Sequence, residues 1–134
     1  MANNDPTPEQ IDQLTAFLPA FETHGREFGH WDVSDPNSEV MHFPYAIYDE
    51  DVDRFFKLAS QPCFADLQYS EKNPGEWIKS AGFYENATLD QLRSVLTWWV
   101  RGERFSEGLW FTALKDGHIQ SLLRRMQELR QMMT

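Results

Sequence analysis

Three polar residues in the last third of the chain have side chains that could carry out chemistry: Arg104, Glu107 and His118. They lie within fifteen positions of one another, at two short turns between expected helices. The planar guanidinium of Arg104 can bind an anion, and the carboxylate of Glu107 can orient a ligand or act as a base. The imidazole of His118 can exchange a proton near neutral pH. These residues therefore define a candidate site for a small enzyme or ligand-binding domain.

The same residues also have a purely structural interpretation. Arg104 and Glu107 are three positions apart, a spacing that suits a local pair capping the helix ends on either side of the turn. His118 could hydrogen-bond a carbonyl of the preceding helix instead of a ligand. The sequence leaves open whether these residues form a ligand site or cap helices.

No metal, cofactor or covalent chemistry is indicated elsewhere. The four histidines show none of the spacings of a zinc site, and no glycine-rich phosphate loop is present. Cys63 is the single cysteine and lies in no catalytic motif, so we expect it to be a small buried side chain. A lone cysteine, no secretory signal and no long apolar run predict a cytoplasmic protein that does not enter membranes.

The charge is distributed unevenly along the chain. The net charge is −9, but residues 1–71 contain 14 acidic and 3 basic residues, whereas residues 72–134 contain 7 acidic and 9 basic ones. Such an acidic front half disfavours direct binding to nucleic acid and can attract a basic protein. It also fits an acidic nucleic-acid mimic of the phage type, or plain solubility.

Aromatic residues supply a second possible contact surface. Trp98 and Trp99 are adjacent in an expected helix, so they point about 100° apart and cannot both lie at the centre of one buried face. One of them is expected to flank the core or line a groove, as aromatic residues at protein interfaces do. The leading functional prediction is therefore a non-enzymatic module that binds another protein through an acidic or aromatic surface. The sequence does not predict the oligomeric state.

Hydrophobic periodicity predicts a mainly α fold, a compact bundle of five or six helices in one domain over residues 7–134 after a flexible tail at 1–6. Capping boxes begin helices at Thr7 and Thr88, and Ser106 is expected to cap a helix that runs through Lys115. The apolar stripes place Leu96, Trp99 and Leu122 in the main core. In the N-terminal half, a short two-stranded β-ribbon within residues 28–47, with its turn at 34–38, competes with an aromatic-rich loop.

The chain resembles an uncharacterised family of small bacterial and phage-type proteins, a domain of unknown function. The resemblance runs from Phe43 to Leu129 and rests on FPYAIYDEDVDRFF, on LDQLRSVLTWWVRGERFSEGLWFTALKDGHI and on LLRRM. Its most specific part is the pattern Arg-Phe-x-Glu-Gly followed by Gly-His-Ile. Ser106 stands where such proteins often carry cysteine, which argues against an essential thiol there. The resemblance implies a mainly helical fold and assigns no activity, cofactor or partner.

Overall fold

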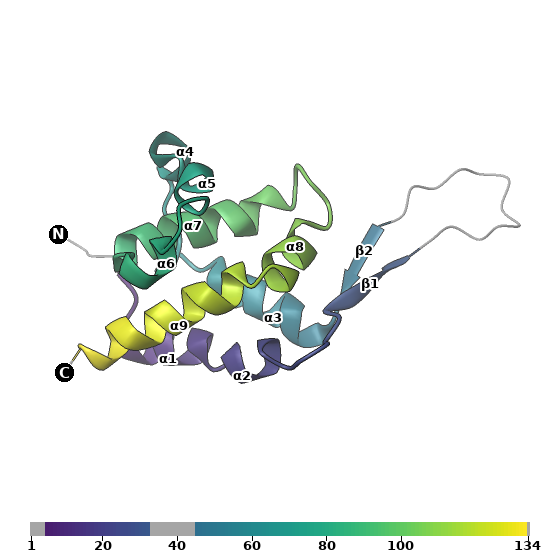
Figure 1. The fold of residues 1–134 in the computed structure, drawn as a ribbon, viewed down its shortest axis with the longest axis horizontal. Helices are drawn as coiled ribbons and strands as arrows, with labels where there is room; N and C mark the ends of the chain where they lie inside the picture. The colour runs from purple at the N-terminus through teal and green to yellow at the C-terminus, as the bar shows by residue number, and fades with distance from the viewer. Residues whose placement is uncertain (1–4, 33–44, 134) are drawn as a thin grey trace, which may run out of the picture.

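The computed structural model describes residues 5–32 and 45–133, and this part of the chain is mainly helical with one small antiparallel sheet (Figure 1). Five of its helices have seven or more residues, which confirms the expected helical fold with a ribbon. The longer helices are α1 (Pro8–Thr15), α3 (Glu50–Ala59), α7 (Leu89–Gly102), α8 (Leu109–Lys115) and α9 (His118–Gln131). The one-turn helices are α2 (Leu18–Phe21), α4 (Tyr69–Lys72), α5 (Pro74–Trp77) and α6 (Phe83–Asn86), and the strands are β1 (Gly29–Asp32) and β2 (Tyr45–Tyr48).

Helices α1 and α7 begin at the two predicted capping boxes. The hydroxyl of Thr88 accepts a hydrogen bond from the N–H of Gln91 at 3.1 Å, and the Gln91 side chain accepts one from the Thr88 N–H at 2.9 Å. Thr7 and Gln10 make the same reciprocal pair. Each box satisfies backbone groups that the first turn of a helix leaves without partners.

The start of α8 differs from the prediction. Ser106 does not cap this helix, which begins at Leu109 after Gly108. The N–H groups of Gly108 and Trp110 instead donate to the carboxylate of Glu103, at 3.0 and 3.1 Å. Glu103, at the end of α7, thus takes the capping role that was expected of Ser106. Its carboxylate is charged and accepts both hydrogen bonds at once.

Helix α9 lies at the centre of the packing and contacts α1, α2, α6, α7 and α8. Leu122 on α9 and Leu96 on α7 are fully buried, and the Trp99 side chain is 3% exposed. The predicted positions of these three residues in the main core are therefore confirmed. Trp98 is only partly buried, as expected for the second of two adjacent tryptophans.

The ribbon extends away from the helical body beside α8 (Figure 1). Its strands pair antiparallel from Gly29 opposite Tyr48 to Asp32 opposite Tyr45. The ring of Tyr48 packs on Phe111 of α8 at a centroid distance of 4.5 Å, which seats the base of the ribbon on the core. The turn expected at 34–38 lies outside the described residues.

Arg26 holds the junction between α2, the ribbon and α3. Its guanidinium donates to the carbonyl of Ala20 at 3.0 Å, to Asp51 at 2.9 Å and to Asp49 at 3.1 Å. Asp49, the residue before α3, makes no capping bond with its side chain and pairs with Arg26 instead. Within the described ranges, no helix is long and apolar enough to cross a membrane.

Candidate functional site

Glu103 joins three elements at the turn between α7 and α8. Besides the two N–H groups of α8, its carboxylate accepts the hydroxyl of Tyr48 in β2, at 2.8 and 2.9 Å from its two oxygens. Burial, followed by this hydrogen bond, raises the pKa of Tyr48, so the hydroxyl keeps its proton and remains a donor. Glu103 was not among the predicted site residues, and the structure places it as a structural connector.

Glu107 holds the ribbon against the same turn. Its exposed carboxylate accepts the N–H of Ala46 in β2 at 3.2 Å. The next residue, Gly108, has φ 92°, and a Cβ added there would collide with the ring of Trp31 in β1. Only glycine meets both conditions at no cost, because it tolerates positive φ and lacks a Cβ.

No Arg104–Glu107 ion pair is found among the described residues, so the expected local cap does not form.

His118 lies elsewhere, at the start of α9. Its Nδ1 is 3.0 Å from the hydroxyl of Tyr84, and its ring lies 5.2 Å from that of Trp99. Burial lowers the pKa of His118, with Asp116 opposing, so the imidazole is neutral at pH 7. Burial raises the pKa of Tyr84, so its hydroxyl stays protonated and hydrogen-bonds with Nδ1 of the imidazole. The expected bond from His118 to a helix carbonyl is replaced by this one.

The three predicted site residues do not line one common cavity among those described. His118 lines an open cavity of about 630 Å³ beside Trp98, under α4 and α5. Arg104 lines two others, of about 290 and 390 Å³, at the carboxyl ends of α3 and α7. The carboxylate of Glu107 is hydrogen-bonded to the ribbon and lines none of these cavities. The residues are close in sequence, but Arg104 follows the end of α7, whereas the ring of His118 packs against Trp99 and Tyr84.

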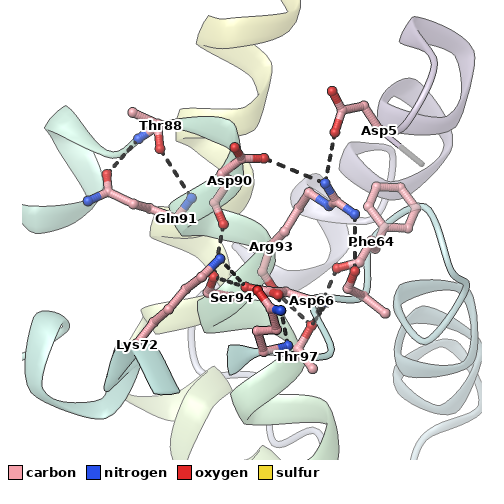
Figure 2. A network of polar contacts seen from close by, with 12 residues as sticks. Asp5, Phe64, Asp66, Lys72, Thr88, Asp90, Gln91, Arg93, Ser94 and Thr97 are labelled. Carbon is pink, nitrogen blue, oxygen red and sulfur yellow. Dashed lines mark hydrogen bonds and ion pairs between the residues drawn. The ribbon is translucent and has the colours of Figure 1, made fainter. Parts of the chain in front are cut away.

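A polar network fixes the loop between α3 and α4 against α7 (Figure 2). The N–H of Asp66 donates to the hydroxyl of Thr97 at 2.9 Å, and Lys72 donates to the Asp66 carboxylate at 2.8 Å. Arg93 donates to the carbonyl of Ala65 at 3.0 Å and to Asp5 at 2.8 Å. Because Ala65 and Thr97 both line the 290 Å³ cavity with Arg104, this network sets the shape of one of its walls.

Because the Asp66 carboxylate is ionised in this network, we expect the free energy of unfolding to fall in acid. Burial opposes ionisation of Asp66, but hydrogen bonds from Lys72, Ser94 and Gln68 outweigh it and lower its pKa. The folded state therefore favours the carboxylate, whose contribution is complete above the unfolded pKa of about 3.9 and is lost as the pH falls through the folded value. We expect Asp66→Asn to have a flatter dependence of unfolding free energy on pH below about 4 than the parent, measured by urea denaturation. Equal slopes would contradict the assignment.

Exposed large apolar side chains gather at the ribbon and the neighbouring turn. Phe105 is 86% exposed, Tyr45 50% and Trp31 46%. Ile47, on the other face of the ribbon from Trp31, is 36% exposed. The bond between Glu107 and Ala46 and the contact of Trp31 with Gly108 join the ribbon to the turn that carries Phe105. We call Trp31, Tyr45, Ile47 and Phe105 the ribbon-end surface.

The fold is thus that of a small helical domain with a projecting ribbon and two separate surface features, aromatic and cationic. The chain belongs to the Family of unknown function (DUF6508), whose profile matches residues 6–132. The match confirms the resemblance seen in the sequence and extends it at the N-terminal side over residues 6–42. Comparison with curated proteins and with solved structures gave no match.

Proposed function

We propose that the protein is a binding module that contacts another protein through the ribbon-end surface. The observation that carries the proposal is the clustering of four large apolar side chains, three of them aromatic, on one joined pair of segments. Large apolar side chains exposed to water in one small region mark an interaction site; here Tyr45 and Ile47 lie on one face of the ribbon and Trp31 on the other. Tryptophan, tyrosine and phenylalanine are also the residues enriched in the buried centres of protein interfaces.

The structure holds this surface in place before any partner arrives. Glu103 fixes the turn to β2 and α8, and Glu107 fixes it to the edge of β2. Binding then costs little conformational entropy, because the aromatic side chains project from segments that are already ordered. A preformed surface of this kind favours contact with a folded partner.

The Glu107 carboxylate also restricts how a partner can bind. The N–H of Ala46 points away from β1 and would be available to pair with an added strand, but it is already bonded to Glu107. Strand addition at that position of β2 would require this bond to break. The contact is therefore made through side chains, with Phe105 and Tyr45 as its most exposed aromatic groups.

Charges beside the surface indicate a partner with basic groups around an apolar patch. Asp49, Glu50 and Glu107 are exposed carboxylates on the ribbon, the start of α3 and the turn. Asp49 and Glu50 belong to the acidic front half of the chain, Asp49 being paired with Arg26, and Glu107 belongs to the other half. Carboxylates at the rim speed association with a positively charged surface and discriminate against acidic proteins.

Site-specific photocrosslinking in cells tests the proposal. A photoreactive phenylalanine analogue placed at Phe105 or at Tyr45 should give the same discrete crosslinked product. The matched control is the analogue at Leu67, which is 75% exposed and lies in the loop between α3 and α4, outside this surface. The product should weaken when Trp31→Ala is added, since that change removes an aromatic contact from the same surface.

Crosslinking of equal strength from Leu67, or different products from Phe105 and Tyr45, would reject the ribbon-end surface as the binding site.

The salt dependence of crosslinking then tests the charge argument separately. A basic partner should be captured less efficiently as the ionic strength rises, because screening weakens the attraction of its charges to the rim carboxylates.

A further inference from the structure

We infer that the cavity between the carboxyl ends of α3 and α7 binds the phosphoryl group of a small molecule. Arg101 and Arg104 line it together with Ser60 and Thr97, and its volume is about 290 Å³. No carboxylate is among its lining residues. This inference is independent of the protein-binding role, because the cavity lies on different residues from the ribbon-end surface.

The two guanidinium groups have no carboxylate partner among the described residues. Five other arginines of the described chain make ion pairs: Arg26, Arg93, Arg124, Arg125 and Arg130. Arg54, exposed on α3, also makes no ion pair among the described residues, but Arg101 and Arg104 differ from it because they line one cavity together. Their charges remain available to a ligand.

The dipole of α7 does not cancel this positive charge. The carboxyl end of a helix carries the equivalent of about half a negative charge, and basic residues there are often explained by it. Here α3 and α7 both end beside the cavity. The two helix ends together supply about one negative charge, against the two full positive charges of Arg101 and Arg104. About one positive charge is left over at this cavity, and it favours an anion, whereas Asp53, Glu103 and Lys57 line only the neighbouring cavity.

The geometry of Arg101 suits an oxyanion. Its guanidinium carbon lies 5.6 Å from the centroid of the Tyr69 ring, a cation–π contact that holds the side chain without neutralising its charge. Arg104 follows three residues later, one turn further along the chain. The hydroxyls of Ser60 and Thr97 already donate to backbone carbonyls, so the arginines supply the charged donors.

The neighbouring cavity of about 390 Å³ offers room for the rest of the ligand. It shares Ser60, Val100 and Arg104 with the first, and its wall includes Phe56 and Trp110. The two rings are stacked at a centroid distance of 4.0 Å; Phe56 is buried behind Trp110, and the partly exposed ring of Trp110 supplies the apolar surface. Asp53 and Glu103 also line this second cavity, which disfavours a second anionic group there. The expected ligand is a phosphate monoester with an apolar or aromatic body.

Titration with phosphate, followed by NMR of backbone amides, tests the site. Inorganic phosphate should replace chloride at constant ionic strength, giving saturable shifts at Ser60, Arg101 and Arg104. Arg104→Gln should weaken the affinity about tenfold or more, as expected for loss of a charge-assisted hydrogen bond. The matched control is Arg54→Gln, an exposed arginine of α3 that lines neither cavity, and it should leave the affinity unchanged.

Further ligands and one further variant complete the design. Phenyl phosphate should bind more tightly than inorganic phosphate, since its ring can cover the exposed part of Trp110. Acetate should bind more weakly because it carries one charge. Arg101→Gln should weaken phosphate binding as Arg104→Gln does. Shifts that do not saturate, or equal affinity in Arg104→Gln and Arg54→Gln, would overturn the site. Phenyl phosphate no tighter than phosphate would overturn the assignment of the ligand class.

Discussion

Leu122→Ala is expected to lower the free energy of unfolding by about 2–5 kcal/mol, which is the range for removing a large aliphatic side chain from a packed core. Leu122 is fully buried in α9, the helix that packs against α1, α2, α6, α7 and α8. A cavity formed there touches many elements, and few of them can move inward to fill it without losing contacts on their other side. Chemical denaturation followed by circular dichroism measures the loss.

Leu67→Ala is the matched control for this experiment. It removes the same atoms from a side chain that is 75% exposed, so we expect a change within about 0.5 kcal/mol. A loss of similar size in both variants would show that the effect does not come from the core. A change below about 0.5 kcal/mol in Leu122→Ala would show that α9 does not occupy the centre of the packing.

Features that depend on neighbouring residues could be predicted from the sequence. The capping boxes at Thr7 and Thr88 need only residues three positions apart, and the buried stripe of α9 repeats with the period of a helix. The start of α8 could not be predicted in this way. Its cap is Glu103, whose carboxylate is held by Tyr48, 55 positions earlier in the chain. The one-turn helices α4 and α6 are too short to show a hydrophobic period.

The candidate site was harder to predict because closeness in sequence does not set the direction of a side chain. Arg104, Glu107 and His118 are neighbours in the sequence, but the helix turns direct them to a cavity, to the ribbon and to Tyr84. The exposure of Phe105 also has no sequence signal, since an apolar residue in a turn is usually covered. One available signal was the spacing of Arg101 and Arg104, which puts two charges on adjacent turns.

The Arg101–Arg104 cavity and the ribbon-end surface meet in the sequence at Arg104 and Phe105, yet they depend on different supports. Ala65 and Thr97, held by the Asp66 network, form a wall of the cavity. Glu103 and Glu107 hold the ribbon-end surface. Variants of Asp66 should therefore affect anion binding with little effect on protein binding, and variants of Glu103 should do the reverse.

Glu103→Ala is expected to lower the free energy of unfolding by about 1.5–3 kcal/mol, the range for loss of a hydrogen bond to a charged group. The change leaves the hydroxyl of Tyr48 and the N–H groups of Gly108 and Trp110 without their acceptor. All three lie in partly buried positions, where water replaces a lost partner only in part. Urea denaturation of the variant measures the loss, with Glu85→Ala, an exposed glutamate of α6, as the control.

A double-mutant cycle with Tyr48→Phe identifies which part of the loss belongs to the ribbon. Tyr48→Phe removes only the hydroxyl and keeps the ring packed on Phe111. If Glu103 joins β2 to the turn, the two changes should be coupled by about 0.5–3 kcal/mol, as for groups that share a hydrogen bond. If the two changes in unfolding free energy are additive, Glu103 caps α8 but does not join β2 to the turn. In that case the ribbon would be held to the turn by Glu107 and the contact of Trp31 with Gly108, and Glu107→Ala, which removes the acceptor of the Ala46 N–H, should then cost more than Tyr48→Phe.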